Sequence, residues 1–532
     1  MTGLREPMVS TRGGTLRGFW AERSGSASGS ASASAGSGSG SARAESRSAG
    51  AESASAGAES SSGVAAFLGV PYAQAPVGPR RFRAPEPVEP WDGVRDALAF
   101  GATAPKRPYR APLDTLLPDP DVAGKNCLNL NIWAPWPPPG GRSATGRPVM
   151  VWIHGGSLVH GSSAVPVYDG EAFARDGVVL VSLNYRLGIE GFGVFPDAPA
   201  NLGLRDQLAA LTWVRENIAA FGGALDRVTV FGESAGAISL AALLASPLAR
   251  GLFRRAVLQS GAPTALPLDR ARRTTEAIAR RLGVAATARA LSAVPPERLL
   301  DAQTEVTGKG SPLTGGHSFQ IAVDGEVLPR DPFEALRAGA AADVDLLMGT
   351  NTEEYRLWFV PSGLTERIGR LALRAAAWKA GVPARTVRTY RSRRPGETPG
   401  EVLGALATDK LLRVPQNRLA DARAAGPGAT YVYEFGWRSP VLGLGACHAL
   451  EIAFVFDTLD RPGAAALTGP DVPRPLADAM HSAWVRFATT GDAGWRRWDG
   501  SRPVMTFGRP GDDGPTVVES PREEELRAWG VG

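Results

Sequence analysis

Cysteine is almost absent from this sequence, with Cys127 and Cys447 the only two in 532 residues. That count excludes a disulfide-rich framework and a zinc site built from several thiolates. Lysine is also scarce, so arginine carries most of the positive charge, and the formal net charge is +5 at pH 7. No segment combines clustered arginine with interleaved aromatic side chains, as a nucleic-acid-binding face would. We therefore expect no nucleic-acid partner.

Long hydrophobic runs are missing as well. No uninterrupted apolar stretch approaches the roughly 20 residues that a membrane-spanning helix needs. Residues 1–7 lack the apolar core of a signal peptide. These absences predict a soluble, cytoplasmic protein without a membrane partner, and we expect a monomer.

Residues 24–63 are almost wholly serine, alanine and glycine, and they lack the apolar side chains that would offset the entropy lost on ordering. We expect a disordered, low-complexity insertion there. Apolar segments at 14–20 and 64–70 flank it and are typical of paired strands, so the insertion would lengthen a hairpin loop at small entropic cost. The whole sequence is 43% hydrophobic, and we expect one domain over residues 5–530.

Apolar strands and amphipathic helices alternate along the chain, which predicts an α/β fold with a mostly parallel, twisted sheet flanked by helices. Alanine- and arginine-rich helical regions, expected to cover the active site as insertions, span about 265–345 and 365–425. A helix is predicted over 206–221, and the final helix over 474–489. The predicted strands of the sheet are 148–154, 177–185, 228–231, 255–260, 344–351 and 430–435.

Ser234 lies in the pentapeptide Gly-Glu-Ser-Ala-Gly at 232–236, directly after a predicted strand and before an apolar helix. The pentapeptide alone is a weak signal, because the chain is rich in glycine and serine. Its strand–turn–helix context is that of a nucleophile elbow, in which small residues permit a strained turn and the hydroxyl is exposed above the sheet. This context predicts a serine hydrolase.

A serine hydroxyl needs a positioned base, and the chain has five histidines, of which three follow Ser234. His481 lies within a predicted helix, where a structural role is expected. His317 lies in a glycine-flanked loop with no acid at a strand end between it and the serine. His448 lies in a loop after a strand and is favoured as the base, with a structural histidine as the alternative.

The third member of a triad is an acid, expected in a loop at the carboxyl end of a strand. The segment 349–355 meets that condition and holds two candidates, Glu353 and Glu354. Two solvated loop carboxylates are the alternative.

Several short motifs, in this order, resemble the type-B carboxylesterases of the α/β-hydrolase fold, a family related to the cholinesterases, and in particular their bacterial para-nitrobenzyl-esterase-like members. The resemblance covers almost the whole chain except residues 24–63. It is carried by the motifs at 69–73, 76–82, 127–132, 152–156, 184–188, 203–207, 217–223, 259–261 and 448–452.

The resemblance implies a Ser–Glu–His triad of Ser234, Glu354 and His448. In this family the second carboxylate of the acidic pair is the triad member, which selects Glu354 over its neighbour. Ser260 and Glu233 are implied as supporting residues. No metal or organic cofactor is expected for this chemistry.

Acyl transfer also needs backbone N–H donors for the oxyanion of the tetrahedral intermediate. Ala235, directly after the nucleophile, is expected to supply one from the start of the helix. The resemblance assigns the others to Gly156 and Ser157, with Gly155 as the turn that permits their approach. His154 matches the family's histidine before the glycines and is not a candidate base.

The sequence departs from the family at three informative places. Ser157 stands where a third glycine is usual, and Tyr355 replaces the glycine that usually follows the acid. The family's first cysteine position falls on Ala104, so Cys127 is expected to be a free thiol. No tryptophan occurs in 105–126, where cholinesterases hold a cationic choline, so cholinesterase activity is not expected.

The sequence therefore predicts a serine carboxylic-ester hydrolase that acts on a small-molecule ester through an acyl-enzyme. The alternatives are a non-catalytic cholinesterase-like binding protein, and a hydrolase of amides, carbamates or lactones with the same triad.

Overall fold

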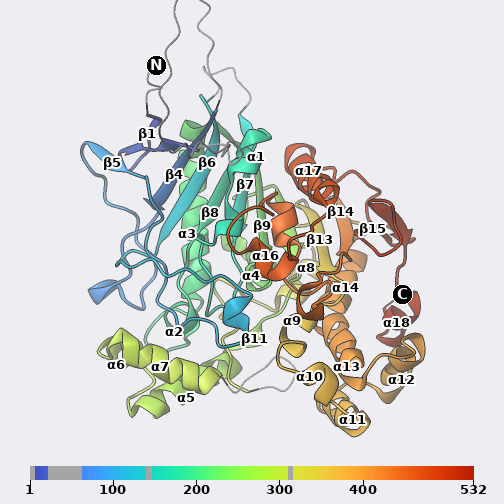
Figure 1. Cartoon of the computed structure of the whole chain (residues 1–532). Coiled ribbons are helices and arrows are strands. Elements are labelled where there is room, and N and C mark those ends of the chain that lie inside the picture. The colour runs from blue at the N-terminus through green and yellow to red at the C-terminus, as the bar shows by residue number, and fades with distance from the viewer. Residues whose placement is uncertain (1–5, 22–62, 139–145, 309–315, 532) are drawn as a thin grey trace, which may run out of the picture.

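A large mixed β-sheet runs through the molecule, with helices on both faces (Figure 1). The computed structural model describes residues 6–21, 63–138, 146–308 and 316–531. The predicted insertion at 24–63 lies outside these residues except for Gly63, which begins a strand. Among the described residues, no helix combines the length and apolar character needed to cross a bilayer.

The sheet has 11 strands in the order β16-β15-β14-β13-β10-β9-β7-β8-β6-β4-β3. Strands β8 to β15 in this order pair in parallel, and the strands at both edges pair antiparallel. This confirms the predicted α/β fold with a mostly parallel sheet. The strands are β3 (Phe19–Trp20), β4 (Gly63–Pro71), β6 (Asn129–Trp136), β7 (Arg147–Ile153), β8 (Val179–Leu183), β9 (Gly223–Glu233), β10 (Arg255–Gln259), β13 (Asp345–Asn351), β14 (Thr430–Phe435), β15 (Pro503–Phe507) and β16 (Thr516–Glu519).

The predicted hairpin of 14–20 with 64–70 is only partly present. Strand β3 pairs antiparallel with β4, but β2 (Thr15–Arg17) leaves the main sheet. It pairs instead with β1 (Met8–Ser10) and β5 (Val94–Asp96) in a small separate sheet. The break falls at Gly18, where a Cβ atom would lie 2.5 Å from the carbonyl oxygen of Ala66. Another two-stranded sheet joins β11 (Leu266–Pro267) and β12 (Ala322–Val323).

Helices cover both faces of the sheet and gather at one end of the molecule, at the bottom of Figure 1. Both predicted helical regions are present. The predicted final helix is α17, but β15, β16 and a short helix follow it, because the short apolar runs after residue 500 did not suggest strands. The helices are α1 (Glu171–Arg175), α2 (Gly188–Phe192), α3 (Leu202–Asn217), α4 (Ala235–Ala245), α5 (Leu268–Leu282), α6 (Ala288–Ser292), α7 (Pro296–Thr307), α8 (Pro332–Arg337), α9 (Arg356–Phe359), α10 (Leu364–Arg367), α11 (Arg370–Lys379), α12 (Ala384–Arg393), α13 (Pro399–Thr408), α14 (Val414–Arg423), α15 (Ile452–Val455), α16 (Ala464–Thr468), α17 (Arg474–Thr490) and α18 (Glu523–Ala528).

The continuous apolar character of the central strands reflects burial on both faces. Successive side chains of β7 alternate between two hydrophobic clusters: Val149 and Val151 join one, whereas Met150 and Trp152 join the other. Helix α4 contributes to the first cluster and α17 to the second. The strands are therefore fixed in register by packing from both sides.

The carboxyl ends of the parallel strands meet at one edge, where ligands bind in open α/β sheets. The loop after β7, the turn after β9, the loop after β13 and the longer loop after β14 all reach this edge. These four segments carry the candidate site residues.

Candidate active site

Ser234 occupies a strained turn between β9 and α4. Its backbone has φ 55° and ψ −121°, a conformation that side-chain-bearing residues rarely adopt. A Cβ atom at Gly236 would lie 2.0 Å from the carbonyl oxygen of Ile153, and one at Gly232 would lie 2.6 Å from the same atom. The two glycines are therefore required for the turn to pack against β7, as the elbow motif predicts.

His448 and Glu354 form a close acid–base pair. The Nδ1 atom of His448 lies 2.6 Å from Oε2 of Glu354. The other oxygen of this carboxylate accepts hydrogen bonds from the Ser260 hydroxyl and the Asn351 N–H, both at 2.7 Å. Because Glu354 is fully buried and every contact is to a donor, its carboxylate is fixed in place beside the imidazole.

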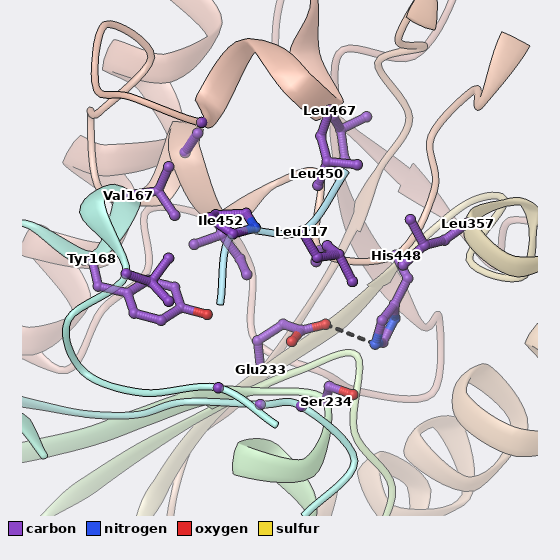
Figure 2. A pocket seen from close by; sticks show the side chains of 18 of the residues that line it. Leu117, Val167, Tyr168, Glu233, Ser234, Leu357, His448, Leu450, Ile452 and Leu467 are labelled. Carbon is purple, nitrogen blue, oxygen red and sulfur yellow. Dashed lines mark ion pairs between the residues drawn. The ribbon is translucent and has the colours of Figure 1, made fainter. Parts of the chain in front are cut away.

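The opposite nitrogen of His448 contacts a second carboxylate. Its Nε2 lies 2.9 Å from Oε1 of Glu233, the residue before Ser234 (Figure 2). Burial by itself would lower the pKa of His448, but the Glu233 and Glu354 carboxylates outweigh burial and raise that pKa well above its ordinary value. No side chain in the described part of the molecule forms a hydrogen bond to the Ser234 hydroxyl, which faces the same cavity as the imidazole.

The loop after β7 approaches the elbow closely. A Cβ atom at Gly155 would lie 2.8 Å from Oε2 of Glu233 and 3.1 Å from Cβ of Ser234. Gly156, with φ 105°, and Ser157, with φ 55°, also line the cavity. Within the described ranges, the N–H groups of Gly156, Ser157 and Ala235 have no hydrogen-bond partner, and that of Ala235 lies in the first turn of α4.

The Ser157 conformation explains why glycine is favoured at this position. A side-chain-bearing residue in the left-handed region costs about 1–2 kcal/mol relative to its preferred conformations. Ser157 nevertheless adopts this left-handed conformation, so the backbone follows the course that a glycine would take.

The two adjacent glutamates have different surroundings. Glu353 pairs with Arg438 at 3.0 Å and accepts the Ala446 N–H at 3.0 Å, and its side chain is 22% exposed. Glu354 points inward to His448. Tyr355 is buried against Trp358 and Phe359 as the chain enters α9.

The other candidate histidines lie elsewhere. His481 is buried in α17, where its Nδ1 lies 2.8 Å from the carbonyl oxygen of Val455, as its expected structural role requires. His317 is not among the residues that line the cavity. Burial lowers the pKa of His154 to about 4, so this ring is neutral at pH 7.

Glu451 is a buried neighbour of the site to which sequence reasoning gave no role. Its carboxyl group accepts hydrogen bonds from Gln259 at 3.1 Å and from Asn351 at 2.7 Å. Burial, followed by the nearby charges of Glu233 and Glu354, raises the pKa of Glu451 to about 8. Its place in the motif at 448–452 was the one available signal.

The cavity in front of Ser234 is mostly apolar and holds about 850 Å³ of space, its open mouth included. Its walls come mainly from the segment 155–168 and the segment around α15 and α16, with smaller parts from α9 and a loop near residue 117. The larger helical regions at 265–345 and 365–425, which were expected to cover the site, supply none of the lining residues. No group of three or more metal-binding side chains occurs in the described ranges. The apolar lining residues include Leu117, Val165, Val167, Tyr168, Leu357, Trp358, Leu450, Ile452, Ala453 and Leu467.

Comparison with known proteins assigns the chain to a family. The carboxylesterase family profile matches residues 49–510. The chain is 39% identical to the para-nitrobenzyl esterase of Bacillus subtilis (strain 168), over 81% of this chain and 87% of the relative. It is 36% identical to the phenmedipham hydrolase of Pseudarthrobacter oxydans, over the same shares. The crystal structure of a Geobacillus stearothermophilus carboxylesterase superposes with a TM-score of 0.79 at 35% identity, covering 98% of this chain and 99% of that one.

Proposed function

Because this chain belongs to the carboxylesterase family, we propose that it hydrolyses carboxylic esters through an acyl-enzyme formed on Ser234. The observation that carries the proposal is the strained turn of Ser234 beside a buried Glu354–His448 pair. A turn of this kind persists only where its surroundings hold it, and it exposes a hydroxyl next to a base.

In the first step, the Ser234 hydroxyl attacks the ester carbonyl while Nε2 of His448 takes its proton. Glu354 orients the ring through Nδ1 and stabilises the imidazolium that forms. Ser260 and Asn351 support this role, because each donates a hydrogen bond to the Glu354 carboxylate. The imidazolium then protonates the leaving alcohol, and the neutral ring activates water to release the acid.

The N–H groups of Gly156, Ser157 and Ala235 would hold the oxyanion of each tetrahedral intermediate. Their freedom from other hydrogen bonds within the described residues supports this role. Preorganised donors of this kind contribute a large part of the acceleration of acyl transfer. Gly155 supports them because only a glycine permits the loop to come so close to Ser234.

Glu233 controls the charge state of the base, because its carboxylate stabilises the protonated imidazole of His448. While His448 is protonated, its Nε2 stays close to Glu233 and cannot accept the Ser234 proton. Loss of the imidazole proton would release Nε2 toward the hydroxyl. The raised pKa of His448 therefore implies activity that increases as the pH rises through that pKa.

The lining of the cavity favours a neutral ester with an apolar acyl group. Leu117, Val167 and Ile452 form an apolar chamber beside Ser234 (Figure 2), and the Glu233 carboxylate at its floor disfavours an anionic substrate. A series of p-nitrophenyl esters of increasing acyl length would measure the length of acyl chain that the cavity accepts. Amides, carbamates and lactones in the same panel would separate ester hydrolysis from the related reactions.

We also propose that the protein works as a cytoplasmic monomer without a cofactor and binds neither nucleic acid nor membranes. Both cysteines are buried and unpaired, and burial raises the pKa of Cys127 to about 12. Two buried, unpaired thiols are consistent with a reducing compartment such as the cytoplasm, where disulfides are rare. Light scattering coupled to size-exclusion chromatography tests the monomer, and a dimer mass would contradict it.

Covalent labelling by a fluorophosphonate, together with hydrolysis of a short p-nitrophenyl ester, tests the mechanism. The parent protein is expected to label on Ser234, and Ser234→Ala is expected to lose labelling and to lose kcat by about 10⁴-fold or more. A non-catalytic binding protein would not label.

Ser239→Ala is the matched control. Ser239 lies in the second turn of α4, and its hydroxyl donates a 2.8 Å hydrogen bond to the carbonyl oxygen of Ala235. This variant is expected to label fully. Unchanged hydrolysis by Ser234→Ala would sink the proposal.

A further inference from the structure

The loop that carries Gly156 and Ser157 is strained over consecutive residues. Gly156, Ser157 and Leu158 all have positive φ values, of 105°, 55° and 63°. Two side-chain-bearing residues in succession in the left-handed region need neighbours that hold them there. The elements that anchor this loop therefore bear on the position of the oxyanion donors.

His160 closes this turn. Its N–H donates a 2.8 Å hydrogen bond to the carbonyl oxygen of Gly156. Its own carbonyl oxygen lies 2.3 Å from the position that a Cβ atom of Gly156 would take. A small displacement of the His160 backbone would therefore displace Gly156.

A buried ion cluster holds His160 from a distant part of the chain. One oxygen of Asp119 lies 3.2 Å from Nδ1 of His160, and the other accepts the Gly161 N–H at 3.1 Å. Because a carboxylate accepts only, the His160 Nδ1 carries the proton. Lys106 lies 3.3 Å from Asp119, and these two side chains are only 2% and 4% exposed.

The same cluster also contacts a residue that lines the cavity in front of Ser234. The ring of Tyr109 stacks on His160, with centroids 4.0 Å apart and an angle of 23° between the planes. Tyr109 also lines the cavity in front of Ser234. One imidazole therefore connects the oxyanion turn, the buried carboxylate and the cavity wall.

We propose that Asp119, held by Lys106, is a positioning residue that fixes the oxyanion turn through His160 and the Gly161 N–H. The inference rests on the proposed ester hydrolysis and assigns a function to a cluster outside the triad. Asp119 touches no reacting atom; it acts by setting where the Gly156 and Ser157 donors point.

The charge state of the cluster suits this role. Burial by itself would raise the pKa of Asp119, but the hydrogen bond from His160 and the Lys106 charge outweigh burial and lower that pKa. The carboxylate is therefore ionised at neutral pH and can accept both hydrogen bonds. A buried ion pair contributes little net stability because both charges must lose their hydration, whereas its fixed geometry can specify one arrangement of the backbone.

Three variants of the full-length protein test the inference. Asp119→Asn weakens both hydrogen bonds, Lys106→Met with Asp119→Asn removes both charges so that none is left unpaired, and His160→Phe keeps the ring stack but loses the donor. Each is assayed for kcat and KM on a short p-nitrophenyl ester, and for inhibition by a trifluoromethyl ketone, whose adduct with serine places an oxyanion in the same turn.

Removal of one oxyanion donor lowers kcat by about 10²- to 10³-fold. Displacement of the donors without their removal should lower kcat less, by about tenfold. We expect this fall in kcat in all three variants, with KM changed less than about threefold and the inhibition constant of the ketone raised in proportion to the loss in kcat/KM. If Asp119→Asn does not fold, the charge-neutral double variant and His160→Phe decide the question.

Asp345→Asn is the matched control, since Asp345 also accepts a backbone N–H, from Ala429 at 2.9 Å, and lies 3.7 Å from the cation of Arg255. It lies at the start of β13, the opposite end of the sheet from the site. We expect a lower melting temperature and an unchanged kcat.

Parent-like kcat and ketone inhibition in the folded variants would overturn the inference, as would an equal loss of kcat in Asp345→Asn. Failure of the proposed function gives a different result, because the parent protein itself would then neither label with a fluorophosphonate nor hydrolyse the ester.

Discussion

His448 lies between two carboxylates, Glu354 at Nδ1 and Glu233 at Nε2. The first contact suits an orienting acid, because Glu354 is fully buried and receives two further hydrogen bonds. The second contact opposes catalysis while the ring is protonated. The chemistry of this single imidazole therefore depends on which carboxylate is charged and at what pH.

Glu233→Gln removes the charge nearest Nε2. The raised pKa of His448 should fall, because burial then acts against the protonated ring with one carboxylate fewer. Since the base must be neutral, the acidic limb of the kcat/KM profile should move to lower pH. A pH–rate profile measures this, and an acidic limb at the parent pH would contradict it.

The adjacent glutamates allow the acid to be identified directly. Glu354→Gln should lower kcat by roughly 10³- to 10⁴-fold, because an amide cannot stabilise the imidazolium or fix its tautomer. Glu353→Gln should leave kcat within about twofold of the parent value, since this side chain pairs with Arg438 at a partly exposed position, where such pairs contribute little. Steady-state kinetics of both variants provide the comparison, and the reverse order of effects would exclude Glu354.

At the scale of elements, the geometry of the site depends on how closely the loop after β7 packs against the turn at Ser234. The loop after β7 and the elbow after β9 approach so closely that glycines are required on both sides. The sheet enforces this approach because β7 and β9 are hydrogen-bonded neighbours. A methyl group added at the contact must move one of the two elements.

Gly155→Ala places such a methyl group 2.8 Å from Oε2 of Glu233 and 3.1 Å from Cβ of Ser234. The loop should shift and carry its donors away from the reacting carbonyl, so that kcat falls about 100-fold. Gly500→Ala is the control, because nothing lies within 4 Å of a Cβ atom there, and its kcat should equal that of the parent. Parent-like kinetics for Gly155→Ala would show that the contact can relax.

At the scale of the whole molecule, we interpret residues 5–530 as one domain because a single sheet takes strands from Phe19 to Glu519. One of its two antiparallel edges ends in β4 and β3, where Trp20 pairs with Ala65 and the Ala21 N–H donates to the Val64 carbonyl oxygen at 2.9 Å. The two chain segments that flank 22–62 are thus already side by side.

Replacement of residues 22–62 by a short glycine–serine turn should preserve the enzyme. The loop shortens by about three doublings, which lowers its closure cost by about 2 kcal/mol at most. The free energy of unfolding in urea should therefore equal or slightly exceed that of the parent, with the same kcat. Loss of activity on this replacement would mean that the segment takes part in function.

The sequence by itself determined the alternation of strands and helices, the elbow at Ser234 and the loops that bear Glu354 and His448. These features depend on neighbours along the chain: apolar periodicity, small residues at a tight turn, and breaks at strand ends. Strands β6, β15 and β16 were not predicted, because polar residues and prolines interrupt the apolar runs by which the other strands were recognised.

Only the tertiary structure decided which groups meet. The chemistry of the loop does not distinguish Glu353 from Glu354, and only the family resemblance favoured Glu354; in the structure, Glu354 is the one buried beside His448. The Glu233–His448 contact, the Asp119–His160 contact and the apolar cavity each join segments that are distant in the chain. Such contacts depend on how the sheet and its loops pack, and no local pattern encodes them.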